Sequence, residues 1–406
     1  MTLLHSNQSF AVRAGEPGNG SQSLDLLFER MGLPRENPLG AILRPGQRVV
    51  VKPNLVFDRH YRGRNVGTLI TSPLLIRAVC DRVFEAVGRE GEIILGDAPL
   101  QTCDWDRLVT ETGLVRWPLE YASRGYWLTL ADFRKFSSTD PKRLRQSPVT
   151  RRGDPNGYRA VNLGSDSLHA GREHSGYEVT GDDPEATLSD HTASNYEYLI
   201  SASVLSADAL VSLPKLKTPR KSGLGCALKN LLGISGNNGW LPRHATGNKE
   251  ETTGGQCRER SWRDNDTFWR TVVDLNRIAV YADKHGAMRS DPQRSILTVV
   301  DAMIDSESEG PMAPNPAHVG YLLGGLNPVA VEVAVTRLTE WPEEQLRHLR
   351  GVFGLDRFPL TAFPQGGVEV SSFPLPLPAL SRFLRPLPGH AIPFPNSKPS
   401  SVEVTV

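Results

Sequence analysis

The sequence has few cysteines, and their spacing matches no common metal centre. Cys80, Cys103, Cys226 and Cys257 are scattered along 406 residues and form no CxxC pair. Zinc ribbons and ferredoxin-like iron–sulfur segments need such pairs, so neither is expected. The pattern is typical of reduced thiols, and we therefore expect a cytoplasmic protein.

Long apolar runs and a net charge of one sign are also missing. No segment approaches membrane-spanning length, and residues 1–20 lack the apolar core of a signal peptide, so no membrane partner is expected. A formal net charge of +1, from 46 basic and 45 acidic residues, supplies no field that would recruit nucleic acid. Any anion binding must therefore be local.

One stretch, residues 209–232, combines features that favour an anion site. The apolar run 209–213 predicts a buried strand that ends at Pro214. Basic residues follow closely: Lys215, Lys217, Arg220 and Lys221. Gly223 and Gly225 then precede a short predicted helix with Lys229 and Asn230. Free N–H groups and the dipole of a helix start add to lysine charge, so we expect an anion here. The alternative is a solvated basic turn.

The first clear structural unit begins at residue 47. Residues 49–51 predict a buried strand that ends at Lys52, Pro53 and Asn54. A helix is expected from Ser72-Pro73 to Gly88, followed by a strand that ends at Asp97. A strand–helix–strand unit makes its two strands parallel, so Asn54 and Asp97 are expected to share one crevice at their carboxyl ends.

Residues 137–190 are polar with little periodicity, which indicates an insertion or a lid. Their histidines, His169 and His174, and the following His191 fit no compact metal motif and are expected to be exposed. The apolar side chains of 196–205 are assigned to a helix face.

The second half of the chain again places polar residues after strands. A helix over 268–282, capped by Asp266 and ended by Gly286, is followed by a strand over 296–300 that delivers Asp301. Glu309 follows in a turn, a strand is expected over 319–323, and a helix begins after Asn327. The prolines beyond residue 358 predict an extended arm.

Together these elements predict an α/β protein with two lobes, mostly parallel sheets flanked by helices, a polar loop insertion and a proline-rich C-terminal tail. The expected parts are an N-terminal extension (1–46), a first α/β lobe (47–136), a polar insertion or lid (137–195), a second α/β lobe with the PKLKT and ALKN motifs (196–357) and the tail (358–406).

Three blocks in order resemble the domain of unknown function family 362 (DUF 362). They are VVVKPNL at 49–55 with ILGDAP at 94–99, LPKLKT with ALKNLLGI between 213 and 234, and TVVDAM through EGP to NPVAVEVA between 298 and 334. The sequence differs from the family pattern at Pro219, where a histidine is usual, and at Asn327 and Glu332, where aspartates are usual. The order of its elements is also similar to that of the nickel-pincer lactate racemases, which implies a site in the cleft of a two-domain α/β protein.

Several residues are candidates for the chemistry. We expect Lys215, Lys217 and Lys229 to bind a phosphate or carboxylate, with Asn54 and Asn230 orienting it. Asp97, Asp301 and Glu309 are candidates for a general base or for oxygen ligands of a divalent metal. His244 is a further titrating candidate, although a lone loop histidine is more often ordinary surface, and Cys226 is expected to be a small buried residue rather than a nucleophile.

The sequence thus favours an enzyme that acts on an anionic small metabolite by proton transfer, as an isomerase, epimerase or lyase. The alternative is a non-catalytic carrier of an anion or a metal, or a partner protein. The candidate acids and bases at strand ends favour the enzyme, and the missing histidine favours the carrier.

Overall fold

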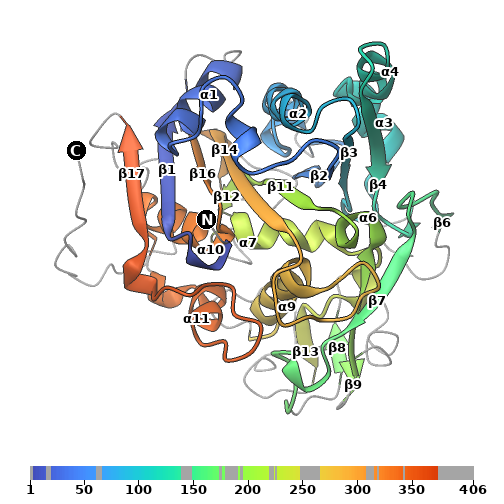
Figure 1. Cartoon of the computed structure of the whole chain (residues 1–406). Helices are drawn as coiled ribbons and strands as arrows, with labels where there is room; N and C mark the ends of the chain where they lie inside the picture. The colour runs from blue at the N-terminus through green and yellow to red at the C-terminus, as the bar shows by residue number, and fades with distance from the viewer. Residues whose placement is uncertain are drawn as a thin grey trace.

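The computed structural model describes residues 3–14, 20–60, 66–138, 149–172, 176–178, 191–192, 195–218, 224, 226–246, 266–307, 315–317, 320–341 and 343–373. One large sheet organises them (Figure 1). Its strands, from one edge to the other, are β17 (Glu369–Phe373), β1 (Gln8–Arg13), β16 (Tyr321–Gly325), β14 (Ser295–Glu307), β11 (Ala209–Leu213), β2 (Arg48–Pro53), β3 (Glu92–Asp97) and β4 (Trp127–Asp132). Two more strands, β12 (Lys215–Thr218) and β15 (Asn315–Ala317), pair with β14.

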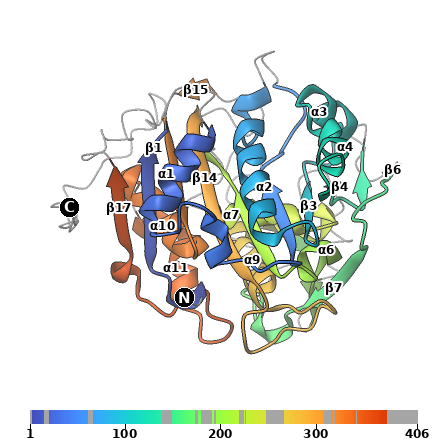
Figure 2. The same cartoon turned by 45° about the horizontal axis from the view of Figure 1, so that its top comes forward.

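The predicted α/β class is confirmed, because most neighbouring strands run parallel and helices pack on both faces of the sheet (Figures 1 and 2). The strands alternate their side chains between two apolar cores: Val50 of β2 faces one, and Val49 and Val51 face the other. One core receives α1 (Gly20–Arg30), α2 (Pro73–Val87), α3 (Trp105–Glu111) and α4 (Trp117–Ala122). The other receives α6 (Ala202–Leu205), α7 (Ala227–Asn230), α9 (Phe268–Tyr281), α10 (Pro328–Leu338) and α11 (Arg347–Phe353).

The predicted strand–helix–strand unit is present as β2, α2 and β3, and its strands are parallel. Helix α2 begins with Pro73 and ends at Gly88, whose φ of 69° is a conformation that glycine adopts without strain. The large sheet contains strands from both expected lobes, since β2 pairs with β11. The carboxyl ends of β2, β3 and β11 therefore lie at one edge of a common sheet.

Two predicted elements differ from the structure, residues 196–205 and the ends of the helix over 268–282. Residues 196–205 are mainly the strand β10 (Asn195–Ser201), because Tyr196, Tyr198 and Ile200 alternate with less buried residues. Strand β10 forms a small sheet with β7 (Tyr158–Asn162) and β9 (His191–Thr192). Helix α9 ends at Tyr281, before Gly286, and Asp266 bonds to the side chains of Trp269 and Arg270 rather than capping the backbone.

Two of the three histidines predicted to be exposed are buried. His169 is 1% exposed and its ring contacts the hydroxyl of Thr271, and His191 is 0% exposed with its Nε2 2.8 Å from the carbonyl of Trp240. The prediction was wrong because His169 packs against α9 and His191 packs against Trp240. His174 lies outside the described residues.

The remaining short strands form two pairs, β5 (Phe136–Ser137) with β6 (Val149–Thr150), and β8 (Gly176–Glu178) with β13 (His244–Thr246). The part of the chain predicted to be a tail contributes β17, an edge strand that pairs with β1. None of the helices in the described ranges combines the length and the apolar character that crossing a membrane requires.

Candidate functional site

The carboxyl ends of β2 and β3 are joined by a buried ion pair. Nζ of Lys52 lies 2.7 Å from Oδ1 of Asp97, and the two side chains are 1% and 4% exposed. The backbone N–H groups of Leu55 and Ala98 donate to the two oxygens of Asp97, at 2.7 and 2.9 Å. Burial lowers the pKa of Lys52, and Asp97 opposes this effect. Asp97 therefore acts as a counter-ion and as an acceptor for two loop N–H groups.

Asn230, the last residue of helix α7, contacts this ion pair. Nζ of Lys52 donates to Oδ1 of Asn230 at 3.1 Å, and the Asn230 amide donates to the Lys52 carbonyl and to the Ser212 hydroxyl. Gly233 follows α7, and a Cβ there would come within 2.7 Å of Cε of Lys52. A glycine at this position thus lets the backbone approach the ion pair closely.

A second buried ion pair joins β12 to β14. Nζ of Lys215 lies 3.1 Å from Oδ2 of Asp301, with both side chains at most 2% exposed. The N–H of Ser72, just before α2, donates to the same oxygen at 2.8 Å, and the N–H of Met303 donates to Oδ1 at 3.1 Å. Asp301 lies within a long strand rather than at a strand end, and its charge holds Lys215 and the start of α2 together.

Lys217, also on β12, is buried without a carboxylate partner among the described residues. Its Nζ donates to Oδ1 of Asn54 at 2.5 Å, and the residue is 9% exposed. Its pKa lies well below the usual value, first because of burial and then because of the charges of Lys229 and Lys215. In a poorly solvated region like charges repel strongly, so the neighbouring lysines disfavour the charged form of Lys217.

Lys229 lies on α7 beside two other charged side chains. Burial and, to a smaller extent, the charge of Arg243 lower its pKa to about 7, although Glu332 acts in the opposite direction. Glu332, which is fully buried on α10, accepts the N–H of Leu228 at 3.0 Å and contacts Nε2 of His348 at 3.1 Å. A lysine with a pKa of about 7 exchanges protons readily at neutral pH, as a general acid or base must.

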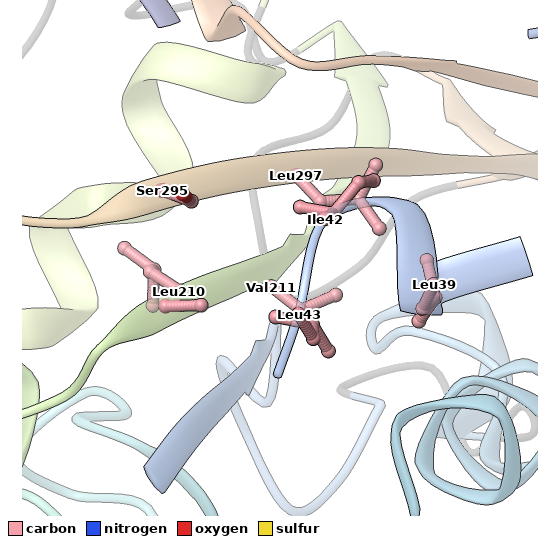
Figure 3. A pocket seen from close by; sticks show the side chains of 8 residues that line it. Leu39, Ile42, Leu43, Leu210, Val211, Ser295 and Leu297 are labelled. Carbon is pink, nitrogen blue, oxygen red and sulfur yellow. The ribbon is translucent and has the colours of Figure 1, made fainter. Parts of the chain in front are cut away.

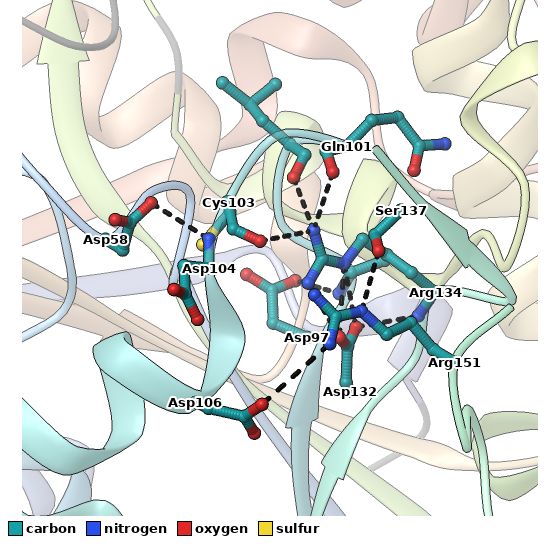
Figure 4. Close-up of polar contacts among 12 residues, drawn as sticks. Asp58, Asp97, Gln101, Cys103, Asp104, Asp106, Asp132, Arg134, Ser137 and Arg151 are labelled. Atoms are coloured by element: carbon teal, nitrogen blue, oxygen red, sulfur yellow. Dashed lines mark hydrogen bonds and ion pairs between the residues drawn. The ribbon is translucent and has the colours of Figure 1, made fainter. Parts of the chain in front are cut away.

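A network of polar contacts fixes the loop after β3 (Figure 4). Arg134 binds Asp132 through two nitrogens, and its Nη1 donates to the carbonyls of Leu100, Gln101 and Cys103. Asp132 ends β4 and is paired in register with Asp97. This network holds residues 98–103 over the end of β3, where Ala98 also bonds to the Gly233 carbonyl at 2.9 Å.

A small apolar hollow lies at the opposite ends of the strands (Figure 3). Its lining includes Leu39, Leu43, Leu210 and Leu297, together with Ser295 at the start of β14. No charged side chain lines this hollow, and it lies at the other ends of the strands from the lysines described above.

The structure brings together most of the residues singled out in the sequence. Seven of the nine are linked by the hydrogen bonds, ion pairs or charge effects described above: Lys215, Lys217, Lys229, Asn54, Asn230, Asp97 and Asp301. His244 begins β13, and Glu309 lies outside the described residues. Among the residues that the structure describes, no three His, Cys, Asp or Glu side chains are grouped so that they could hold a metal ion.

Lys52, Arg243, Phe268 and Gly233 were missed as site residues. A lysine at the end of a valine run, VVVK, was the available signal for Lys52, since a buried strand tolerates a charge only with a partner. Arg243 and Phe268 carry no such signal, because only tertiary packing brings these residues, which are distant in the sequence, to Lys229.

Comparison with known proteins agrees with the family resemblance. Residues 164–337 match the family model described as Domain of unknown function (DUF362), which confirms the resemblance over that range. No curated protein matches the chain. Among solved structures, the lactate racemase apoprotein from Thermoanaerobacterium thermosaccharolyticum is similar with a TM-score of 0.38 and 9% sequence identity, over 85% of this chain and 57% of that chain. The chain thus spans less than two thirds of the length of that structure.

Proposed function

We propose that this protein, whose residues 164–337 match DUF362, is an enzyme that binds an anionic small metabolite beside Lys217 and Lys229 and moves a proton on it. The observation that carries the proposal is the burial of Lys52, Lys215 and Lys217 beside the described carboxylates Asp97 and Asp301, which pair with Lys52 and Lys215, whereas Lys217 donates to the amide of Asn54. A phosphate or carboxylate would relieve the repulsion that lowers the pKa of Lys217.

Lys229 is the group we propose for the proton transfer. Its pKa of about 7 makes both protonation states accessible near neutral pH, whereas Asp97 and Asp301 already serve as counter-ions. An isomerase, epimerase or lyase step at a carbon next to a carboxylate is the reaction class that this group favours.

A specific observation also favours a non-catalytic anion carrier. Each oxygen of Asp97 and of Asp301 accepts a backbone N–H, and each carboxylate also pairs with a buried lysine, so both already serve as structural counter-ions. Under the carrier hypothesis Lys229 would bind the anion and transfer no proton.

Replacing Lys229 with alanine should weaken sulfate binding at least about tenfold, since a hydrogen bond to a charged group contributes about 1.5–3 kcal/mol. Sulfate is the probe because its charge stays constant near neutral pH, and isothermal titration calorimetry at low salt gives its affinity. The exposed Lys284 supplies the control, Lys284→Ala, which should bind sulfate like the wild type. If Lys229→Ala keeps full affinity, or unfolds, the proposal is rejected.

A further inference from the structure

The amine of Lys229 shares an aromatic ring with a second cation. Nζ of Lys229 and Cζ of Arg243 each lie 5.6 Å from the ring centroid of Phe268, the first residue of α9. Nη2 of Arg243 donates to Oδ1 of Asn238 at 2.6 Å, which fixes the guanidinium. The lysine therefore has an apolar face on one side and a fixed positive charge close by.

A third cation completes this arrangement. Among the charges that lower the pKa of Lys217, that of Lys229 has the largest effect. Lys217 is itself fixed by Asn54. Lys229 thus shares the ring of Phe268 with Arg243 and acts through its charge on Lys217, so these two positive groups are the ones we assign to a carboxylate bound next to it.

The backbone beneath Lys229 is held firmly. The N–H of Leu228 donates to Glu332 at 3.0 Å, and the Leu228 carbonyl accepts from Nδ2 of Asn276 at 2.8 Å. Glu332 and Asn276 are both fully buried, on α10 and α9. A short helix anchored on two longer ones keeps the amine in one place, as covalent catalysis requires.

We propose that Lys229 forms an imine with the carbonyl carbon of a 2-oxo acid whose carboxylate pairs with Lys217 and Arg243. This inference deepens the proposed function and rests on it. The amine nitrogen adds to the carbonyl carbon, and the carbonyl oxygen leaves as water, so the step needs no oxidant or reductant. The protonated imine then withdraws electrons from the adjacent carbon, which eases the loss of a proton there.

The electrostatics of the site agree with this chemistry. An ordinary lysine is almost wholly protonated at neutral pH, and an ammonium group has no electron pair for the attack. Burial and the neighbouring Arg243 leave Lys229 with a pKa of about 7, so about half of it is free amine at that pH.

Reductive trapping tests the inference on the full-length protein. The protein is incubated with pyruvate and sodium cyanoborohydride, and labelled lysines are located by peptide mass spectrometry. We expect one reduced pyruvate adduct at Lys229, at least about tenfold above the exposed Lys135 and Lys284. Lys229→Arg, which keeps the charge, should lose this adduct. Acetone, which lacks the carboxylate, should label Lys229 far less than pyruvate.

Two results would overturn the inference. Equal labelling of Lys229, Lys135 and Lys284 would show ordinary surface reactivity, and equal labelling of Lys229 by acetone and pyruvate would remove the role of the carboxylate. Sulfate binding measured on the same preparation separates the two proposals. Sulfate binding without trapping rejects the imine and leaves the anion site, whereas the loss of both rejects the proposed function as well.

Discussion

Asp97→Asn is expected to lower the free energy of unfolding by about 3–5 kcal/mol, the usual cost of leaving one charge of a buried pair uncompensated. Lys52 is 1% exposed, and without Asp97 its ammonium would keep only the Pro53 carbonyl and the Asn230 amide. The shape of the side chain is retained, so the loss measures the missing charge and the missing acceptor for one backbone N–H rather than packing. Urea unfolding followed by circular dichroism gives the value.

A surface ion pair provides the matched control. Arg107 and Glu111 lie 2.7 Å apart on α3, with both side chains close to half exposed. Glu111→Gln should cost under about 1 kcal/mol, because water screens such pairs. The double variant Lys52→Met/Asp97→Asn should recover part of the loss, since the uncompensated charge is gone. A cost for Asp97→Asn as small as that of the control would show that the buried pair is not a structural support of the site.

Lys217→Met is expected to have the opposite effects on stability and on binding. Methionine removes a buried ammonium that three other lysines repel, at the cost of one hydrogen bond to Asn54, so the variant should be more stable than the wild type. Sulfate affinity should fall at least about tenfold, because a charge that faces the anion is lost. Denaturant midpoints and calorimetric titrations measure the two effects.

The gain in stability should depend on pH in a defined direction. The pKa of Lys217 is lower in the folded state than in the unfolded chain, so the unfolded chain binds more protons between these two values. The stability of the wild type therefore falls as pH falls through this range, and the advantage of Lys217→Met grows. Lys135→Met, at an exposed position, should change neither stability nor binding. A clear destabilisation by Lys217→Met would identify Lys217 as a structural residue.

Local sequence patterns predicted the parts of the fold that local physics determines. The valine run of β2, the helical spacing of α2 and the proline and glycine at its ends identify these elements without reference to the rest of the chain. Strand β1 was not predicted, because its short sequence becomes a strand only through pairing with β16 and β17. Strand β12 was not predicted either, because its pairing with β14 likewise depends on residues far along the chain.

The candidate site, like the fold, was predictable from the sequence only in part. Lysines and carboxylates next to strand ends were visible in the sequence, since parallel strands bring their carboxyl ends to one edge. The ion pairs that they form were not visible. The strand order β14-β11-β2-β3 determines which lysine pairs with Asp97 and which pairs with Asp301, and this order cannot be read from the sequence. The burial of His169 and His191 depends on α9 and Trp240 in the same manner.

We expect an anion to bind where burial and mutual repulsion lower the pKa values of the lysines, so binding should be coupled to the uptake of protons. Calorimetric titration with sulfate at about pH 8, in buffers of different ionisation enthalpy, counts the protons bound with each anion. Lys229, whose pKa is about 7, is then mostly neutral, and Lys217 is shifted in the same direction. We expect an uptake of about one proton or more per sulfate in the wild type, and less in Lys229→Ala. Binding with no proton uptake would contradict it.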